Sequence, residues 1–303
     1  MKCEVILTRS GAPAMRDRAS GEVMHPGTGP GVEPQALYVV PSRLDARLRD
    51  TGRHDASDDL VLLDVGLGAA SNAVAAWRVS EALRDASEAS EASEANEASE
   101  ANEARRLQIV SFDDDLSALE LALRPEHAES FALTTTGGDA HAAATALLAS
   151  GRHETSRTTW RLSLGDFPVQ LAREPSASVD IVFWDFYSSK THPHLWSLAT
   201  LRELRRVCRS GATLHTYSTA TSFRAGLLLA GFAVGVGGGT GDRAETTLAA
   251  VDVADLERPL DARWLARLER SSAALPADVG DDAGARAAAL AQIRACAQFA
   301  VAR

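Results

Sequence analysis

The chain has 303 residues, of which 45% are hydrophobic, a composition normal for a protein that buries the core of one large domain or two small ones. Its 31 basic and 41 acidic residues give a formal net charge of −10, which excludes the basic overall surface of a general nucleic-acid coating protein. Cys3, Cys208 and Cys296 are far apart, which excludes a disulfide framework and a Cys-x-x-Cys zinc site.

The apolar runs near the start are too short for a targeting or membrane segment. Only Val5, Ile6 and Leu7 are consecutive there, whereas a signal peptide has about 7 to 15 such residues. No stretch approaches the roughly 20 apolar residues of a membrane span. We therefore expect a cytoplasmic protein with reduced thiols and no membrane partner.

Strand-like and helix-like segments alternate through the middle of the chain. Predicted strands cover 60–65, 107–112, 160–164, 179–184 and 211–217, and two more flank the glycine run 237–241. Predicted helices cover 70–84, 140–150, 195–207 and 222–230. This alternation is typical of an α/β fold with a mostly parallel sheet and helices on both faces, and the last two strands predict an antiparallel hairpin at its edge.

Two regions stand apart from this alternation. Residues 86–104 repeat Ala-Ser/Asn-Glu, with six glutamates and no basic residue, and leave no apolar stripe that could enter a core. We expect a solvated, partly helical insert; an acidic partner-binding arm is the alternative. After Asp255, the amphipathic segments 260–270 and 283–299 predict a C-terminal helical appendage.

Small and acidic residues follow the predicted strands. Gly66 and Gly68 come after the first strand, and Asp113, Asp166 and Asp185 come after the next three. In an open sheet of this kind, ligands bind beyond the carboxyl ends of the strands. Glycines there let the backbone approach a ligand at a helix N-terminus, so we expect a binding site at this edge.

The acids favour a nucleoside without phosphates. Asp113 can bind ribose hydroxyls and Asp166 can accept from an adenine amino group, while the Gly-Lys-Ser/Thr of a P-loop is absent, since neither Lys2 nor Lys190 follows a glycine. A dinucleotide fingerprint would have glycine at position 71, where Ser71 stands. We expect a methyltransferase that uses S-adenosyl-L-methionine; an NAD-linked oxidoreductase and a non-catalytic binding module remain the alternatives.

Short motifs along nearly the whole chain, apart from the insert, resemble one family. The upstream motifs are Gly21-Glu22-Val23-Met24-His25 with Gly29-Pro30, Glu33 before Leu37-Tyr38-Val39, Asp64 to Asn72, Ser111-Phe112-Asp113, and Gly165-Asp166. The later motifs are Asp185 to Trp196, Arg209-Ser210-Gly211, Tyr217 to Ala220, Phe223-Arg224, and Ala230-Gly231-Phe232. They are similar to the MnmC-like methyltransferases, which complete 5-methylaminomethyl-2-thiouridine at the wobble position of tRNA.

The resemblance implies a Rossmann-like class I methyltransferase fold with a seven-stranded sheet. It implies a domain over 1–255, with the N-terminal segment 1–45 and the insert 86–104, followed by the appendage 256–303. We expect no attached flavin oxidase domain. The implied reaction is methyl transfer from S-adenosylmethionine to the aminomethyl nitrogen of a modified wobble uridine, with the tRNA anticodon loop as partner.

The resemblance also assigns residues to roles. It implies that Asp185 orients the substrate amine. The implied cofactor-binding residues are Glu33, Tyr38, Asp64, Gly66, Gly68, Asn72, Asp113 and Asp166. The implied substrate-binding residues are Glu22, His25, Tyr187, Lys190, Trp196, Arg224 and Arg243, the last two and Lys190 as phosphate contacts.

Several of these residues have a structural alternative. Trp196 lies on a leucine-rich helical face, a position equally typical of a core, and Tyr38 lies on a predicted apolar strand, where such a residue is more often part of the core. Glu22, His25 and Glu33 could instead belong to a surface turn. His192 and His194 form a His-x-His pair, but no third ligand has a suitable spacing, so we expect no metal.

Three differences from the family pattern keep a second substrate class open. Phe186 stands where the family has glycine or proline, Ala225 where it has a second arginine, and Ala244 where it has arginine. Fewer cationic contacts weaken RNA binding. A methyltransferase of the same fold that acts on a small amine or another metabolite is therefore the alternative.

Deleting residues 86–104 and closing the gap is expected to leave S-adenosylmethionine affinity unchanged, because the repeat has no apolar face to bury. Loop length itself changes stability by only about 0.6 kcal/mol per doubling. Calorimetric titration of the deletion variant and the full chain checks this. Loss of folding on deletion would show that the repeat is a packed helix.

Overall fold

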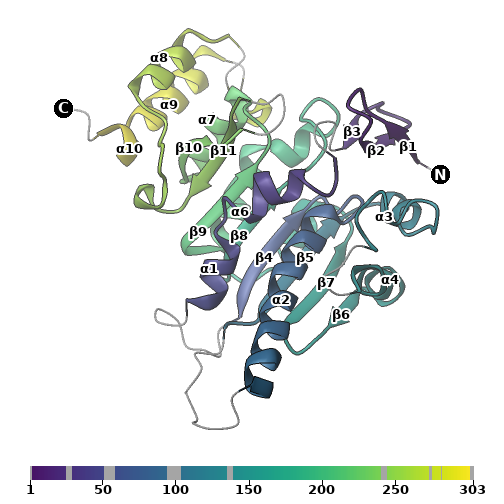
Figure 1. Cartoon of the computed structure of the whole chain (residues 1–303). Coiled ribbons are helices and arrows are strands. Elements are labelled where there is room, and N and C mark those ends of the chain that lie inside the picture. Colours follow the sequence, from purple (N-terminus) through teal and green to yellow (C-terminus); the bar gives the residue numbers. More distant parts are fainter. Residues whose placement is uncertain are drawn as a thin grey trace. The chain divides into compact units, whose positions relative to one another are not determined.

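The computed structural model describes residues 2–24, 29–50, 59–93, 104–134, 139–239, 244–272, 275–280 and 282–300. The chain divides into two compact units, Met1–Gly165 and Asp166–Arg303 (Figure 1). No helix of the described ranges is both long enough and apolar enough to cross a membrane. The domain limits expected from the sequence stay a prediction.

Parallel strands form the main sheet of the first unit. β4 (Leu60–Val65), β5 (Leu107–Asp113) and β7 (Thr158–Leu164) run parallel in that order, as predicted. β6 (Arg152–Glu154) pairs antiparallel with β7 at the edge. This strand is missing from the predicted seven, because three polar residues give no apolar alternation.

Helices α2 (Ser71–Ser93), α3 (Ser117–Ala122) and α4 (Ala140–Ser150) complete this unit, and α2 packs on β5 and β7. The bounds of α4 match the prediction, since the Asp139 side chain caps its start and Gly151, with φ of 72°, ends it. α2 runs beyond the predicted end at residue 84, because alanine and glutamate are good helix formers. Residues 94–103 of the insert lie outside the described ranges.

The N-terminal segment differs from the prediction. It contains a small antiparallel sheet of β1 (Cys3–Leu7), β2 (Pro13–Asp17) and β3 (Val23–Met24), then the π-helix η1 (Gln35–Val39) and α1 (Leu44–Arg49). Tyr38, expected on a strand, is therefore helical, and it is fully buried. Its place in the core agrees with the structural alternative given above.

A buried polar chain crosses the parallel strands of the first unit. The Trp160 indole N–H on β7 donates to the Ser111 hydroxyl on β5 over 2.9 Å. That hydroxyl donates to a carboxylate oxygen of Asp64 on β4 over 2.7 Å. Asp64, Ser111 and Trp160 are all fully buried, so this chain satisfies groups that have no access to water.

The second unit has a mixed sheet in the order β10-β11-β9-β8. β8 (Val179–Trp184) and β9 (Cys208–Thr216) are parallel, whereas β11 (Thr246–Ala250) is antiparallel to β9 and to β10 (Ala233–Gly237). The bounds of β8 match the prediction, and the antiparallel hairpin is confirmed. Residues 240–243 between its strands lie outside the described ranges.

The helices of this unit are α5 (Phe167–Leu171), α6 (Leu198–Val207), α7 (Thr221–Ala230), α8 (Ala262–Arg270), α9 (Ala283–Arg294) and α10 (Ala297–Ala300). Short 3-10 turns cover η2 (Pro193–Trp196), η3 (Val253–Asp255) and η4 (Ala277–Val279). The predicted helix 195–207 is thus two elements, because Ser197 caps α6 through a bond from Thr200 N–H to its hydroxyl.

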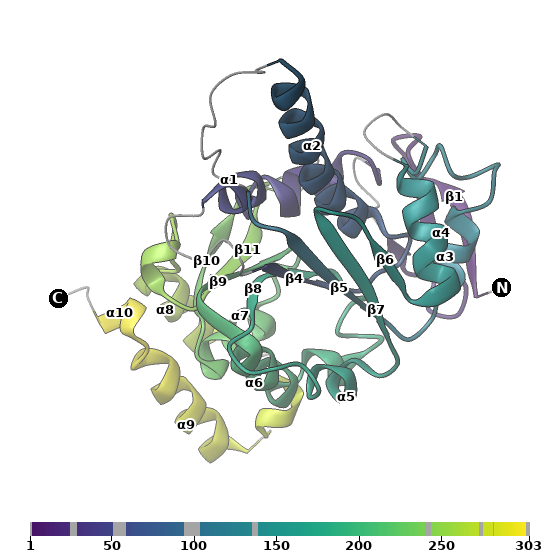
Figure 2. The same cartoon turned by 90° about the horizontal axis from the view of Figure 1, so that it is seen from below.

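The C-terminal helices pack within the second unit (Figure 2). Trp264 of α8 stacks on Phe299, with 6.4 Å between ring centroids. The Gln298 amide bonds both backbone groups of Val234 on β10, at 2.8 and 3.0 Å. The predicted segment 283–299 is interrupted, since α9 ends at Arg294 and α10 begins at Ala297.

We predict that Ser111→Ala lowers the free energy of unfolding by about 2 to 4 kcal/mol, because it removes a bond from each of two buried polar groups. Urea denaturation measures the change. Ser210→Ala, at an exposed position of β9, is the matched control and should change stability by less than about 0.5 kcal/mol. Equal effects of the two substitutions would contradict a role for the buried chain.

Candidate active site

A tight glycine turn joins β4 to α2. Gly66 and Gly68 have φ of 95° and 53°, in the left-handed region that favours glycine. Both Gly66 N–H and Leu67 N–H donate to the Phe112 carbonyl, at 3.1 and 3.0 Å, so the turn is fixed against the end of β5. A side chain at Gly68 would have its Cβ 3.1 Å from the Met24 sulfur, so this position has little room for more than hydrogen.

Asp113 is held directly beside this turn. One carboxylate oxygen accepts from Gly68 N–H at 2.9 Å, and the other accepts from the N–H groups of Asp114 and Asp115 at 2.9 and 3.2 Å. Burial raises the pKa of Asp113 from 3.8 to about 6, although these three hydrogen bonds oppose the shift. The structure therefore brings together Gly68 and Asp113, two residues that sequence reasoning assigned to one ligand.

The start of α2 adds a buried hydroxyl. Ser71 is 5% exposed, and its Oγ has no hydrogen-bond partner among the described residues. This group lies at the N-terminus of a 23-residue helix, next to the turn formed by Gly66 and Gly68. Such a place suits a polar ligand. These features fit the nucleoside-containing cofactor expected from the sequence.

Four other residues expected at the cofactor are buried in the first unit. Asn72 and Glu33 are 3% and 2% exposed, and Tyr38 and Asp64 are fully buried. Asp64 belongs to the polar chain with Ser111 and Trp160, which gives it a supporting place behind the turn. Of the N-terminal residues expected at the substrate, Glu22 is half-buried just before β3, and His25 lies outside the described residues.

In the second unit, Asp166 and Asp185 lie in loops next to secondary-structure elements, as the sequence predicts. Asp166 is the residue before α5, is exposed, and has a carboxylate oxygen 3.6 Å from His194 Nε2. Asp185 comes directly after β8 and is half-buried. No group of three or more His, Cys, Asp or Glu side chains that could hold a metal ion occurs in the parts of the chain that the structure describes.

Two side chains fix the backbone of the loop that follows Asp185. The Tyr217 hydroxyl donates to the Phe186 carbonyl over 2.8 Å, and the Trp196 indole N–H donates to the Tyr187 carbonyl over 3.0 Å. Trp196 is 6% exposed and packs against Phe223, with 4.7 Å between ring centroids. Its surroundings contradict an exposed stacking surface and agree with the core alternative.

The remaining loop residues are more accessible. Tyr187 is half-buried and stacks on His192 with 5.6 Å between centroids and 20° between ring planes. Lys190 is exposed. Tyr187 and Lys190, both expected at the substrate, are thus accessible to one. His192, which stacks on Tyr187, is half-buried beside it.

Arg224 corrects an expectation. It is 1% exposed, and its guanidinium donates to the Thr247 hydroxyl, the Thr246 carbonyl and a Glu245 carboxylate oxygen, at 2.8, 2.9 and 3.1 Å. Burial lowers the pKa of Arg224 and Glu245 opposes that shift. A phosphate cannot reach this side chain, so its expected role as a phosphate contact is wrong. Arg243, the other expected contact, lies outside the described residues.

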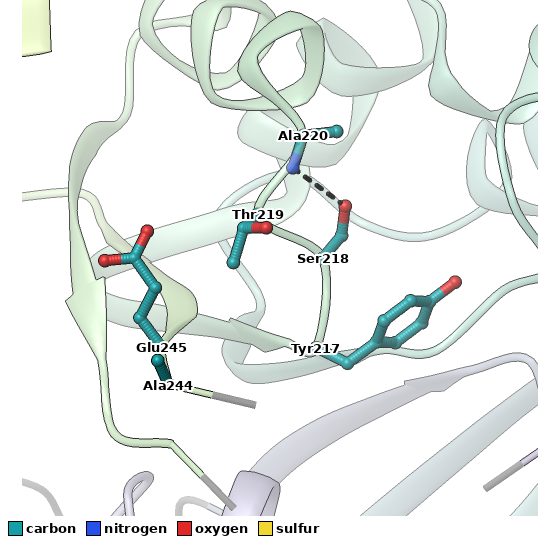
Figure 3. Close-up of a pocket in the computed structure, with 6 residues that line it drawn as sticks. All are labelled: Tyr217, Ser218, Thr219, Ala220, Ala244 and Glu245. Atoms are coloured by element: carbon teal, nitrogen blue, oxygen red, sulfur yellow. Dashed lines mark hydrogen bonds between the residues drawn. The ribbon is translucent and has the colours of Figure 1, made fainter. Parts of the chain in front are cut away.

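Glu245 lines an open depression of about 620 Å³ at the carboxyl end of β9 (Figure 3). The other described lining residues are Tyr217, Ser218, Thr219, Ala220 and Ala244. Sequence reasoning gave no role to Tyr217 or Glu245. A signal existed for Glu245, since an arginine in the apolar helix 222–230 needs an acidic partner.

Comparisons with known proteins find methyltransferase relatives. Residues 141–252 match a family described as S-adenosyl-L-methionine-dependent methyltransferase. A bifunctional protein of Methylibium petroleiphilum, named tRNA 5-methylaminomethyl-2-thiouridine biosynthesis protein MnmC, is 28% identical over 90% of this chain. The protein of the same name from Ralstonia nicotianae is 37% identical over 32% of this chain. The chain covers only 38% and 15% of the lengths of these two relatives.

A solved structure supports the fold. The crystal structure of MnmC2 from Aquifex aeolicus has a TM-score of 0.67 to this chain at 21% identity, and the match covers 96% of this chain and 82% of the other. The expected Rossmann-like class I methyltransferase fold is thereby confirmed. Together with the match over residues 141–252, this makes the chain similar to the MnmC-like, S-adenosylmethionine-dependent methyltransferases. The NAD-linked alternative is therefore set aside.

If Asp113 binds the cofactor as the sequence predicts, its raised pKa predicts weaker binding of S-adenosylmethionine in acid. Asp113 is predicted to accept from two ribose hydroxyls, and its protonation near pH 6 turns one of its oxygens into a donor and removes the negative charge. The dissociation constant of S-adenosylmethionine should rise about tenfold between pH 7 and pH 5, if only the ionised form binds.

Calorimetric titration across this pH range measures the change. Asp113→Asn is the control, because an amide does not titrate there, and its weaker affinity should stay constant with pH. An equal pH dependence in both proteins would contradict the assignment of Asp113 to the cofactor.

Proposed function

We propose that the chain transfers a methyl group from S-adenosylmethionine to the aminomethyl nitrogen of a modified wobble uridine in tRNA. The observation that carries this proposal is the similarity over 90% of the chain to a protein named for tRNA 5-methylaminomethyl-2-thiouridine biosynthesis. Asp185 and the fixed loop after β8 support it. A tRNA substrate also fits the cytoplasmic location expected from the sequence.

The cofactor supplies an electrophilic methyl group on a sulfonium. We assign the backbone of Gly66 and Gly68 to its close approach and Asp113 to its ribose hydroxyls, and Ser71 adds a hydroxyl at the start of α2. Asp166 keeps its expected role at the adenine amino group. Glu33, Tyr38, Asp64 and Asn72, which are all buried, support these residues from behind.

Asp185 acts on the acceptor. Its carboxylate accepts a hydrogen bond from the substrate amine and so points the nitrogen lone pair toward the methyl carbon. As the nitrogen–carbon bond forms and the carbon–sulfur bond breaks, the amine becomes an ammonium, and Asp185 receives the proton that it releases. The two bonds to the carbonyls of Phe186 and Tyr187 hold the loop that positions this carboxylate.

The loop also offers contacts for an unpaired base. Tyr187 and His192 present a stacked pair on which a base displaced from an anticodon loop can stack. Exposed Lys190 is suited to a phosphate. We propose that Glu22 contacts the substrate, and the expected roles of His25 and Arg243 remain proposals.

One observation favours a second candidate, methyl transfer to a small amine. Arg224, expected at phosphate, is buried and paired with Glu245. Fewer cationic contacts to RNA leave a free amine metabolite as the alternative acceptor.

The test uses tRNA from cells that lack the terminal methylation, incubated with the protein and labelled S-adenosylmethionine at low salt. Label is expected in 5-methylaminomethyl-2-thiouridine after digestion to nucleosides. Asp185→Asn should lower kcat at least about 100-fold, because an amide is a weaker acceptor than a carboxylate and cannot take the proton that the amine releases, without changing cofactor affinity.

Asp255→Asn, which removes an exposed acid of the same unit, is the control and should keep wild-type kcat. Absence of label from every tRNA nucleoside, with protein shown to bind the cofactor, would contradict the proposal. Label in a small amine from a metabolite pool would then favour the second candidate.

A further inference from the structure

The buried Arg224 has a consequence for the depression at the end of β9. A guanidinium that is 1% exposed needs a negative partner, because an isolated buried charge is costly. Glu245 provides it, with Oε1 3.1 Å from Arg224 Nη1. Two further N–H groups of Arg224 bond Thr247 and Thr246 on β11, so the guanidinium is fixed from three directions.

This fixed guanidinium in turn fixes Glu245. The Glu245 side chain is 43% exposed, whereas that of Arg224 is 2% exposed, so the carboxylate spans from the buried pair to the open depression. Only one of its two oxygens bonds Arg224 in the described structure. The depression therefore has an oriented negative acceptor in its wall.

The rest of the wall suits a flat polar ring. In Figure 3, Glu245 lies on one side, the Tyr217 ring on the other, and Ser218 and Thr219 between them. Ser218 Oγ accepts from Ala220 N–H at 3.4 Å, which keeps this hydroxyl at the start of α7. A volume of about 620 Å³ lies within the range of small-molecule sites.

Tyr217 connects the depression to the acceptor loop. Its ring lines the depression, while its hydroxyl donates over 2.8 Å to the carbonyl of Phe186, the neighbour of Asp185 in sequence. A group bound in the depression would therefore lie beside the loop that presents Asp185. A phosphate does not suit this place, because Glu245 would repel it.

We propose that the depression binds the acceptor ring of the substrate and that Glu245 accepts a hydrogen bond from its imide N–H. A uracil ring offers this donor at N3, whereas cytosine has an acceptor there. Glu245 thus selects uracil-type acceptors, and Arg224 is a positioning residue that acts through Glu245. This inference rests on the proposed function and adds the residue that selects the base.

The test measures steady-state kinetics on an anticodon stem-loop RNA that carries 5-aminomethyluridine, with and without a methyl group at N3. Wild-type KM for the RNA should rise about 10- to 100-fold on N3 methylation, the range for loss of a hydrogen bond to a charged group. Glu245→Gln should raise KM for the RNA without the N3 methyl group by a similar factor, with kcat changed less than about threefold and cofactor affinity unchanged.

In Glu245→Gln the further penalty of N3 methylation should be small, because Arg224 would bind the amide oxygen and leave the amide NH2, which cannot accept, toward the ring. Glu257→Gln, an exposed glutamate of the same unit, is the matched control for the lost charge and should keep the wild-type KM. Equal KM values for Glu245→Gln and Glu257→Gln, or wild-type indifference to N3 methylation, would overturn this inference alone. If wild-type protein does not methylate the 5-aminomethyluridine RNA that lacks the N3 methyl group, the proposed function is overturned as well.

Discussion

Three buried or partly buried charged groups in the described residues are each compensated by a hydrogen-bonding partner, and that constraint places several of the residues that matter. Asp64 is fully buried and takes a hydrogen bond from Ser111. Asp113 takes three backbone hydrogen bonds and nevertheless keeps a pKa near 6. Arg224 is paired with Glu245. In all three cases at least one partner comes from a separate part of the chain: Ser111 for Asp64, Gly68 for Asp113 and Glu245 for Arg224. Compensation therefore joins elements and orients groups at the ends of strands.

Much of the fold could be predicted from local patterns. β4 and β8 are apolar runs with one aspartate each, and α4 has a capping aspartate and a terminal glycine, so their bounds follow from sequence alone. The small N-terminal sheet and β6 could not be predicted, because short strands with polar residues are stabilised by pairing that is not visible in sequence. The apolar run around Tyr38 fits a strand or a buried helix equally well, and the structure has the helix.

The residues expected at the cofactor could be predicted better from the sequence than the residues expected at the substrate. Glycines and acids after strands predicted the turn at Gly68 and its neighbour Asp113, because parallel strands end at one edge. The places of Trp196 and Arg224 could not be predicted, since residue type alone does not tell whether an aromatic or cationic side chain points into a core. The pair of Arg224 and Glu245 is formed between residues 21 positions apart, with no periodic pattern to indicate it.

The central claim is that the glycine turn after β4 and Asp113 bind S-adenosylmethionine. A crystal structure of the chain with S-adenosylhomocysteine tests this most directly. We expect the ribose hydroxyls within about 3 Å of the Asp113 carboxylate oxygens and the ligand against the backbone of Gly66 and Gly68. A ligand bound elsewhere, with Asp113 still bonded only to the three backbone N–H groups, would contradict it.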